Sequence, residues 1–386
     1  MSRKSNTQVS STTSSQSLLI VNTAIGFGGA ETRVLIEAAA LTPLLQKCAV
    51  AVLRDSPLHV RAVSAGIHCH PIDTGRGDPR TALTLYKIIK KNNYSIVNGH
   101  NSHSIVWAQL AARCHRSVAR ISTIHSDYLN ENPGIKGKLY YWLCMCLFRS
   151  GTQYITVTQN LQDELRQTAI GNNTTLIHNG ISPPSVIAEK PADWPFAKND
   201  VVIGCVARLI AVKGHRYLFE AMSLLSDLPQ IKLLLVGGGK MEPILREQRD
   251  KLGLQDRVFF YGFRDDLNAI YGALDAVCLA SLTEAMPFTL LEAATHGRPL
   301  IATSVGGIPT LFTDNETALL VEPKDPAKLA EKFRMLVEEP AFCQQTAGAA
   351  QQMVLDKFGM DKMIHKLMIT FDRATHAVGS TGAESP

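Results

Sequence analysis

The feature that most constrains the fold is an alternation of short apolar runs with amphipathic segments, which occurs twice along the 386 residues. Runs such as 17–22 and 48–53 are rich in Leu, Ile and Val and are too short for buried helices, so we predict buried parallel strands. Segments between them, such as 79–91, have the apolar spacing of a helix. This alternation predicts doubly wound α/β domains, whose ligands bind beyond the carboxyl ends of the strands.

A proline-rich stretch separates the two series of strands and helices. Four prolines occur there without periodicity: Pro183, Pro184, Pro191 and Pro195. Such a composition predicts a linker, and a chain of this length favours two domains. We therefore expect a disordered tail at 1–15, a first domain at 16–183, a linker at 184–198, a second domain at 199–356, an amphipathic helix at 357–376 and a disordered tail at 377–386.

The composition is that of a soluble globular protein, with 45% hydrophobic and 19% charged residues. Residues 1–183 hold 18 Lys and Arg against 9 Asp and Glu, a net charge of +9, and the remaining residues hold 21 against 25, a net charge of −4. The basic first half suits an anionic substrate or an anionic membrane surface, and we expect no nucleic acid because no nucleic-acid motif is present. Eight cysteines without a Cys-x-x-Cys pair, and no secretory signal, indicate free thiols in the cytoplasm.

The stretch Ser281–Glu292 carries two carboxylates, Glu284 and Glu292, with seven residues between them. It joins a predicted strand at 276–280 to a predicted helix at 290–296, so the free N–H groups at the start of that helix can receive a phosphate. On this pair alone, a helix-capping acid and a solvated helix residue would be the simpler interpretation.

Two cations strengthen the ligand interpretation. Arg208 and Lys213 follow another predicted strand, at the edge where ligands are expected. Together with free amides near Thr289–Leu291, they predict a clamp that neutralises a leaving nucleoside diphosphate without a metal.

Three histidines follow strands of the first series: His100, His103 and His125. Each alone is more often structural, but three at one sheet edge indicate a site, and their spacing does not match a zinc-ligand pattern. The turn Gly26–Glu31 leads from the first strand into a helix. It cannot be the dinucleotide fingerprint, which requires glycine at the position of Glu31, so we predict only a close approach of backbone to ligand.

Several short motifs follow one another in a set order: Gly28-Gly-Ala-Glu31, His125, His178-Asn-Gly-Ile181, Val206-Ala-Arg-Leu209, Lys213-Gly214, Leu235-Val-Gly-Gly238, Tyr261-Gly262, Ser281–Glu292, Gly297-Arg-Pro299 and Val305-Gly-Gly-Ile-Pro309. This ordered set resembles the retaining glycosyltransferases of family 4, which have the GT-B fold. The resemblance implies two Rossmann-like domains facing a cleft, with the last helix crossing back to the first domain. It implies a nucleotide-sugar donor against the second domain, an acceptor against the first, and no metal or other cofactor.

Residue roles follow from the resemblance position by position. Arg208 and Lys213 would bind the diphosphate, and Glu284 and His125 would contact the transferred sugar. The donor-binding positions are Gly28, Gly29, Phe263, Arg264, Phe288, Thr289, Leu290, Leu291 and Glu292, of which Glu292 would bind the ribose and Phe263 and Arg264 the base through their backbone. The leaving phosphate would help to deprotonate the acceptor, with retention and no covalent intermediate. His100 and His103 are candidates on the acceptor side.

Three positions depart from the family pattern: Ala207 and Ala285, where glycine is common, and Thr310, where glutamate is common. The first two could re-aim the loops at the sugar, which leaves the donor sugar open. A further segment, Lys136–Arg149, has aromatic and apolar bulk bracketed by bases, so it could lie on an anionic membrane surface. A core-facing helix is the simpler interpretation, because Trp142 and Leu143 would also serve a core.

We therefore expect a hexosyltransferase that uses a nucleotide-sugar, a UDP-sugar on family frequency. Its acceptor would be a glycan or a lipid-linked molecule in cell-surface polysaccharide or lipopolysaccharide synthesis, and its place the cytoplasm or the inner face of the membrane. Two alternatives stay open: a nucleotide-sugar epimerase on the same fold, and a non-catalytic protein that binds nucleotide-sugars.

Overall fold

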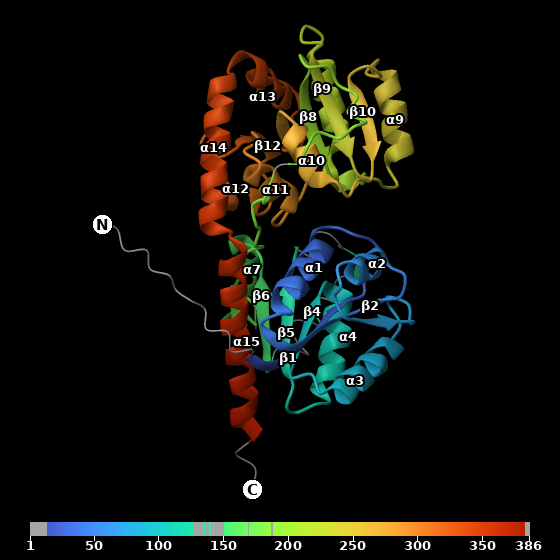
Figure 1. Ribbon diagram of the computed structural model, residues 1–386, viewed down its shortest axis with the longest axis vertical. Helices are drawn as coiled ribbons and strands as arrows, with labels where there is room; N and C mark the ends of the chain where they lie inside the picture. The colour runs from blue at the N-terminus through green and yellow to red at the C-terminus, as the bar shows by residue number, and fades with distance from the viewer. Residues whose placement is uncertain are drawn as a thin grey trace, which may run out of the picture. The chain divides into compact units, whose positions relative to one another are not determined.

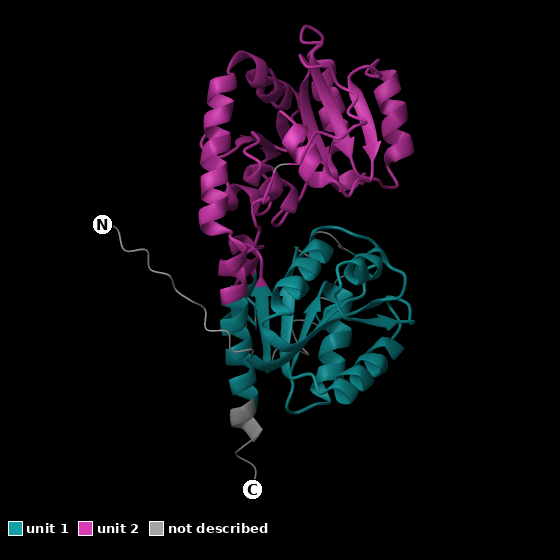
Figure 2. Cartoon of the chain, in the orientation of Figure 1, with its two compact units in different colours: residues 1–155, 165–175, 366–386 teal, residues 156–164, 176–365 magenta. Residues whose placement is uncertain are grey.

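In a computed structural model of the chain, residues 14–126, 134, 135, 139, 142, 150–168, 170–186 and 188–382 are described. The chain divides into two compact units, coloured separately in Figure 2. The first unit comprises Met1–Ile155, Leu165–Thr175 and Lys366–Pro386, and the second comprises Thr156–Glu164 and Leu176–His365.

The first unit contains a seven-stranded sheet in the order β3-β2-β1-β4-β5-β6-β7, labelled in Figure 1. Its strands are β1 (Ser14–Asn22), β2 (Leu45–Leu53), β3 (Cys69–Ile72), β4 (Ile96–His100), β5 (Ala119–Ile124), β6 (Thr152–Thr156) and β7 (Thr174–Leu176). The helices are α1 (Gly29–Leu41), α2 (Pro57–Ser64), α3 (Arg80–Asn92) and α4 (Ser102–Arg113), with a 3-10 turn η2 at Gly171–Asn173. Helix α7 (Gln159–Arg166) follows β6 and belongs to the second unit up to Glu164. Strand β1 is buried on both sides because α1 and α2 pack together on one face and α3 and α4 on the other.

The second unit contains a six-stranded parallel sheet in the order β10-β9-β8-β11-β12-β13. Its strands are β8 (Val201–Val206), β9 (Ile231–Val236), β10 (Val258–Gly262), β11 (Ala276–Leu279), β12 (Leu300–Thr303) and β13 (Leu319–Val321). The helices are α8 (His215–Ser223), α9 (Glu242–Lys251), α10 (Leu267–Ala273), α11 (Phe288–Thr295), α12 (Ile308–Leu311), α13 (Pro326–Glu338) and α14 (Pro340–Lys357), with a 3-10 turn η3 at Ala211–Lys213. The last helix, α15 (Met360–Gly382), begins in this unit and has most of its length in the first.

Both sheets reverse their direction of growth at one point, between β1 and β4 in the first and between β8 and β11 in the second. In doubly wound sheets the crevice beyond the strand ends at such a reversal is where ligands bind. The predicted doubly wound α/β architecture is therefore confirmed, and each sheet has one place where a site is expected.

The predicted strands 17–22, 48–53 and 276–280 end within one residue of β1, β2 and β11, and the predicted helix 79–91 is one residue from α3 at each end. Two helices were not predicted, α12 and the long α14. Helix α14 buries small side chains at helical spacing, namely Cys343, Thr346, Ala347, Ala350 and Val354. Because few of these are large and apolar, the segment shows a weak periodicity in the sequence.

The unit boundaries differ from the predicted domain limits. Residues 156–164 and 176–183 belong to the second unit, although the prediction placed them in the first. Helix α15 divides between the units after His365 and continues to Gly382, into the predicted tail 377–386. Strand β1 begins at Ser14, within the predicted tail 1–15, and the rest of that tail lies outside the described residues.

The predicted linker, residues 184–198, has no helix or strand in its described part, yet it is not a free tether. Phe196 is buried against Phe259, with ring centroids 4.8 Å apart, and Trp194 packs edge-on against Tyr261. Asp193 forms an ion pair with Arg264 at 2.6 Å. The linker is thus fixed along strand β10 and the loop that follows it, within the second unit.

Candidate active site

The switch point of the second sheet brings together three side chains from two loops. Lys213 ends the turn η3, and its Nζ lies 2.5 Å from Oε1 of Glu284, in the loop after β11. Ser281 donates to the same oxygen at 2.6 Å. The side chain of Lys213 is 18% exposed and that of Glu284 is 9% exposed. Within the described residues, Glu284 Oε2 and two ammonium hydrogens of Lys213 keep their capacity to bind a ligand.

Close backbone packing holds this cluster in place. Gly214 has a φ of +66°, and a Cβ there would lie 1.9 Å from the carbonyl oxygen of Ala280. Gly306 has a φ of +54°, and its Cβ would lie 1.9 Å from the carbonyl oxygen of Glu284, which also accepts from the N–H of Gly307 at 3.0 Å. Only glycine fits such contacts, so these loops fix the backbone of Lys213 and Glu284.

Arg208 follows β8 and is exposed. Its loop is held by the glycine turn after β9, where a Cβ on Gly237 would lie 2.1 Å from the carbonyl oxygen of Ala207 and one on Gly239 would lie 2.4 Å from that of Leu209. The N–H of Leu209 donates to Gly238 at 3.0 Å. Arg208 is thus an exposed cation between two residues, Ala207 and Leu209, whose backbones are held by the glycine turn. Such a cation can bind an anion.

Glu292 lies in α11 and is half-buried, with its Oε2 accepting from the Tyr271 hydroxyl at 2.8 Å. Burial raises the pKa of the Glu292 carboxyl, and the bond from Tyr271 opposes part of that shift. Burial also raises the pKa of Tyr271 well above its usual value. Glu292 is therefore not a solvated helix residue, and Tyr271 orients it.

The start of α11 supplies backbone donors. Its N-cap is Pro287, whose side chain makes no capping bond, so Glu284 is not a helix cap. The side chains of Phe288, Leu290 and Leu291 are buried. The N–H of Leu290 donates to the carbonyl of Pro287 at 3.2 Å, so the N–H groups that remain for a ligand at the start of α11 are those of Phe288 and Thr289. Thr289 donates its hydroxyl to the carbonyl of Val206 at 2.8 Å and so ties α11 to β8.

Phe263 and Arg264 follow β10. Phe263 is 57% exposed. Arg264 is paired with Asp193 and Asp266, each at 2.6 Å, and lies over the ring of Tyr261. Its side chain is thus engaged within the protein, which agrees with a role for its backbone.

The departures from the family pattern are accommodated without strain. Neither Ala207 nor Ala285 is among the described residues with positive φ, so neither position needs glycine for its backbone. Thr310 lies in α12 and donates its hydroxyl to the carbonyl of Gly307 at 2.7 Å, at the end of the loop that supports Glu284.

In the first unit, Gly28 and Gly29 begin α1 after the switch point. Gly28 is the N-cap residue, with an extended φ of −166° that any residue adopts. Glu31, at the position that breaks the dinucleotide pattern, accepts from the side-chain amide of Asn22 at 3.2 Å. Asn22 also accepts from Asn101 at 3.0 Å, which ties the end of β1 to the start of α4.

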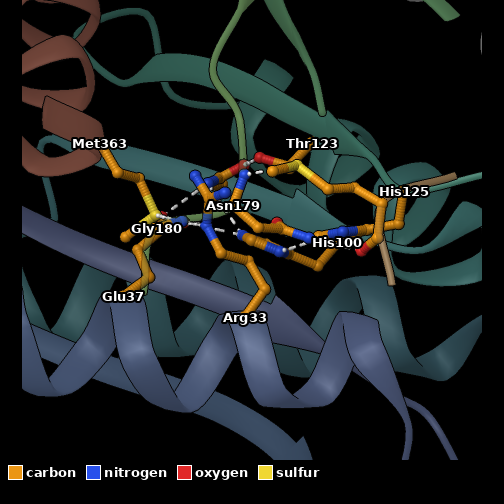
Figure 3. A network of polar contacts seen from close by, with 10 residues as sticks. Arg33, Glu37, His100, Thr123, His125, Asn179, Gly180 and Met363 are labelled. Atoms are coloured by element: carbon orange, nitrogen blue, oxygen red, sulfur yellow. Dashed lines mark hydrogen bonds and ion pairs between the residues drawn. The ribbon is translucent and has the colours of Figure 1, made fainter. Parts of the chain in front are cut away.

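The structure brings His100 and His125 together, with His100 Nδ1 2.9 Å from His125 Nε2, as Figure 3 shows. His100 is completely buried, so it cannot itself contact an acceptor, whereas His125 is half-buried. Desolvation holds the pKa of each well below the usual value. His103 is half-buried in α4, and burial lowers its pKa to about 4.

Behind these histidines lies a buried ion pair that the sequence did not indicate. Arg33 Nε lies 3.1 Å from Glu37 Oε2 in α1, and both side chains are fully buried (Figure 3). Ser281 and Tyr271 were likewise not predicted. The i, i+4 spacing of Arg33 and Glu37 was a visible signal, but such pairs are usually solvated.

No three His, Cys, Asp or Glu side chains lie close enough together to hold a metal ion in the part of the chain that the structure describes. Among the described helices, none is both long and apolar enough to cross a membrane. The segment Lys136–Arg149 falls almost wholly outside the described residues.

Known proteins resemble both units. A family model described as "Glycosyltransferase Family 4" matches residues 27–183, and one described as "Glycosyl transferases group 1" matches residues 186–353. The chain is 26% identical over 303 residues to EpsD of Bacillus subtilis (strain 168), named as a glycosyltransferase, covering 74% of this chain and 79% of that protein. It is 26% identical over 269 residues to the Escherichia coli UDP-Gal:alpha-D-GlcNAc-diphosphoundecaprenol alpha-1,3-galactosyltransferase, covering 64% of this chain and 67% of that enzyme.

A solved structure of Anabaena Alr3699/HepE in complex with UDP-glucose matches with a TM-score of 0.81. The two proteins are 22% identical, and the match covers 92% of this chain and 99% of that one. This likeness shows the fold of the chain.

Proposed function

Because the chain belongs to the glycosyltransferases of family 4 and has the GT-B fold, we propose that it transfers a hexose from a UDP-sugar to a glycan or lipid-linked acceptor, with retention of configuration. The observation that carries this proposal is the Lys213–Glu284–Ser281 cluster at the switch point of the second sheet, with exposed Arg208 in the loop that leads to Lys213. The choice of UDP draws on the E. coli relative, named for UDP-Gal, and on the UDP-glucose complex of the Anabaena protein.

The charges of the cluster suit the departure of a diphosphate. Lys213 uses one of its three N–H donors on Glu284, and the other two can bind phosphate oxygens together with the guanidinium of Arg208. The backbone N–H groups of Phe288 and Thr289, at the start of α11, add donors that are fixed in advance, whereas the N–H of Leu290 already donates to the carbonyl of Pro287 at 3.2 Å. These groups would stabilise the charge that develops on the leaving phosphate, so we propose that the reaction needs no metal.

Carboxylates would position the two sugars of the donor. Glu284 holds Oε1 against Lys213 and Ser281, which leaves Oε2 to accept from hydroxyls of the transferred sugar. Glu292, oriented by Tyr271, would accept from the ribose hydroxyls. His125 would donate to the transferred sugar, and Gly28 and Gly29 would allow backbone to approach the donor. The leaving phosphate would take the proton of the acceptor hydroxyl.

A lipid-linked acceptor would bring the protein to the inner face of the membrane, in cell-surface polysaccharide or lipopolysaccharide synthesis. Support comes from Ile135, Leu139 and Trp142, which are 88%, 52% and 53% exposed and stand four and three residues apart in the sequence. Apolar side chains at this spacing can enter the interface of a bilayer.

Vesicle binding tests this part of the proposal. Two triple variants should no longer sediment with anionic vesicles. One replaces the apolar residues Ile135, Leu139 and Trp142 with Ser, and the other replaces the basic residues Lys136, Lys138 and Arg149 with Glu. Ser in place of the exposed Val60 and Val63 is the control and should leave binding unchanged. Equal binding by all variants would contradict membrane association.

The two alternative functions predict different behaviour from the same cluster. An epimerase would convert the nucleotide-sugar without an acceptor, and a non-catalytic binding protein would hold it unchanged. The complete set of Arg208, Lys213, Glu284 and Glu292 favours transfer, because a binding protein has no need for all four charges.

Thermal melting against UDP, GDP and ADP, and against their sugar conjugates, tests the donor. A bound nucleotide stabilises the fold by about 2.7 kcal/mol at a hundred times its Kd. Of the three nucleotides, only UDP, free or as its sugar conjugates, should raise Tm. The Glu292→Ala variant should lose this rise in Tm. The Glu331→Ala variant, which changes an exposed residue of the same unit, should keep it. No shift with any nucleotide would contradict the donor class, and product of inverted configuration would contradict retention.

A further inference from the structure

The buried ion pair of α1 is connected to His125 through a chain of side chains in the first unit. Glu37 accepts from Arg33 through Oε2 and from the amide nitrogen of Asn98 through Oε1, the latter at 3.1 Å. The Asn98 amide nitrogen also lies 2.9 Å from His100 Nε2. Arg33, Glu37, Asn98 and His100 are all 0% exposed, so no bulk solvent competes with these bonds.

The orientation of the Asn98 amide follows from the groups around it. The hydroxyl of Thr123 donates to Asn98 Oδ1 at 3.0 Å, and the amide nitrogen faces the carboxylate of Glu37. A flipped amide would place its oxygen 3.1 Å from a carboxylate oxygen, where neither atom can donate. As long as Glu37 is ionised, the amide nitrogen must therefore be directed at Glu37 and at His100.

The position of each imidazole proton follows in turn. An amide nitrogen donates and cannot accept, so His100 Nε2 must be the acceptor and carries no proton. The proton of neutral His100 then lies on Nδ1, which donates to His125 Nε2 at 2.9 Å. His125 Nε2 is consequently an acceptor, and the proton of a neutral His125 lies on Nδ1.

We propose that Arg33, Glu37, Asn98 and His100 are positioning residues that hold His125 as the neutral imidazole with its proton on Nδ1. This makes His125 a hydrogen-bond donor and not a general base, and the part of the inference that concerns turnover rests on the proposed function. Burial raises the pKa of the Glu37 carboxyl, and the ion pair with Arg33 opposes that rise and favours the carboxylate. The Glu37 carboxylate orients Asn98, and Asn98 fixes the proton of His100 and through it that of His125. Nδ1 of His125 has no hydrogen-bond partner among the described residues, so it is available to a substrate hydroxyl.

The charged surroundings agree with a neutral pair of rings. Arg33 and Glu37 of α1 are the charged groups that act on this pair, and Cys48 of β2 faces Glu37 with its pKa raised to about 12, so it is neutral. A proton added to His125 Nε2 would confront the Nδ1 proton of His100. Desolvation and Arg33 also hold the pKa of His100 below its usual value, which disfavours a protonated pair.

The simpler interpretation is that Arg33 and Glu37 only stabilise α1. Buried ion pairs often add little stability over apolar residues of similar size, and replacing both members together avoids leaving one charge unpaired. The double variant Arg33→Met with Glu37→Met therefore separates the two interpretations. It should fold, yet it removes the carboxylate that orients Asn98.

The test is ¹⁵N NMR of the imidazole nitrogens in the full chain, recorded between pH 5.5 and pH 8 without substrate. The wild type should show His125 with a protonated Nδ1 and an unprotonated Nε2 throughout. The double variant should show both tautomers of His125. Its kcat should fall about two- to fivefold, because only the fraction of His125 that has lost the Nδ1 proton loses the hydrogen bond, with KM for the UDP-sugar unchanged. His100→Asn, whose amide can donate from the place of Nδ1, should keep the tautomer.

A matched control uses another buried amide of the same unit. Gln109 donates to Ser122 at 2.9 Å and accepts from Thr152 at 3.0 Å, without a bond to the histidine pair. Gln109→Met should lower stability and leave the tautomer of His125 unchanged.

A proton on Nε2 of His125 in the wild type would overturn the inference, and so would an unchanged single tautomer in the double variant. If the double variant fails to fold, His100→Leu takes its place, because it removes the donor to His125 and should release the tautomer. Absence of sugar transfer in the wild type would overturn the proposed function alone, because the ring nitrogens are observed without substrate.

Discussion

The two parallel sheets share their central strand order, yet their switch points are built by different means. At the β8/β11 point, loop backbones press against one another through glycines, and charged side chains stand at or near the surface. At the β1/β4 point, buried side chains form the support: an ion pair, an asparagine and two histidines. The same topology therefore fixes functional groups either by backbone contact or by an interior polar network.

This difference determines which substitutions each region tolerates. Adding one methyl group to a glycine should displace the loops at the β8/β11 point of the second unit. Replacing a charged or hydrogen-bonding side chain should instead disrupt the polar network at the β1/β4 point of the first. The predictions below test this contrast, beginning with the largest expected effect.

Gly306→Ala should have the largest effect. The new Cβ would lie 1.9 Å from the carbonyl oxygen of Glu284, so the loop and the Glu284 backbone must move apart. We expect a loss of more than about 3 kcal/mol in the free energy of unfolding and no detectable transfer. Urea denaturation and a transfer assay measure both.

Gly253→Ala provides the matched control. Gly253 has a φ of +66°, but a Cβ there would meet nothing within 4 Å. Its cost should be the conformational one alone, about 1–2 kcal/mol, with transfer retained. Equal losses from the two variants would show that close backbone contact is not what holds the second site.

Lys213→Ala should lower kcat/KM by about 10²- to 10³-fold, because it removes a positioned donor from the leaving diphosphate. Lys328→Ala breaks an exposed ion pair with Glu331 in the same unit and should leave kcat/KM unchanged. Steady-state kinetics with the UDP-sugar compares them. A loss below threefold in Lys213→Ala would remove Lys213 from the diphosphate site.

The sheets and the ligand edge were predictable because short apolar strands and following polar loops are local features of the sequence. Arg208, Lys213 and Glu284 were predicted from their place after strands. The bond between Lys213 and Glu284, 71 positions apart, comes from the adjacency of β8 and β11. Local pattern thus indicated the members of the second site, and topology set their pairing.

The interior network could not be predicted in the same way. Arg33 and Glu37 have the spacing of a solvated helix pair, and only the packing of α1 on the sheet shows that they are buried. Asn98 stands in a short strand, where nothing local tells which atoms it will meet. The packing of the linker was more visible in the sequence. Its prolines alone suggested a free tether, but Trp194 and Phe196 are aromatic residues of the kind that pack against a domain.

Acid should destabilise the first unit more than the second. Burial lowers the pKa of His70 and His103 to about 4 in the first unit, and holds those of His100 and His125 well below the usual value. Between about pH 6.5 and pH 4 the unfolded chain binds protons that the folded one does not, so stability falls as pH falls. For fully buried His100 the slope approaches about 1.4 kcal/mol per pH unit.

Hydrogen exchange measured unit by unit at pH 7, 6 and 5 checks this. The second unit has two histidines that also make stability fall as pH falls. Burial lowers the pKa of His215 to about 4 and lowers that of His296. The first unit should lose protection at a higher pH. Equal loss in both units would mean that the interior histidines do not set its acid stability.

Asp193→Asn should have the smallest effect, and it concerns the linker. The change weakens the exposed bonds that Asp193 accepts from Arg264 and Tyr261, and it leaves buried Phe196 in place. We expect an unchanged unfolding midpoint, because exposed ion pairs contribute little to stability. Exchange of the Trp194 amide, which donates to the carbonyl of Pro191 at 3.1 Å, should become faster.

Phe196→Ala is the companion variant, because it removes the buried ring that holds the linker against Phe259. It should speed the same exchange further and lower the unfolding midpoint. If instead Asp193→Asn leaves the Trp194 amide unaffected while Phe196→Ala exposes it, apolar packing alone fixes the linker. The second unit would then hold the linker by side-chain packing, whereas it holds the loops at the β8/β11 point by backbone contact. The contrast between the two units would apply to their switch points and not to their whole surfaces.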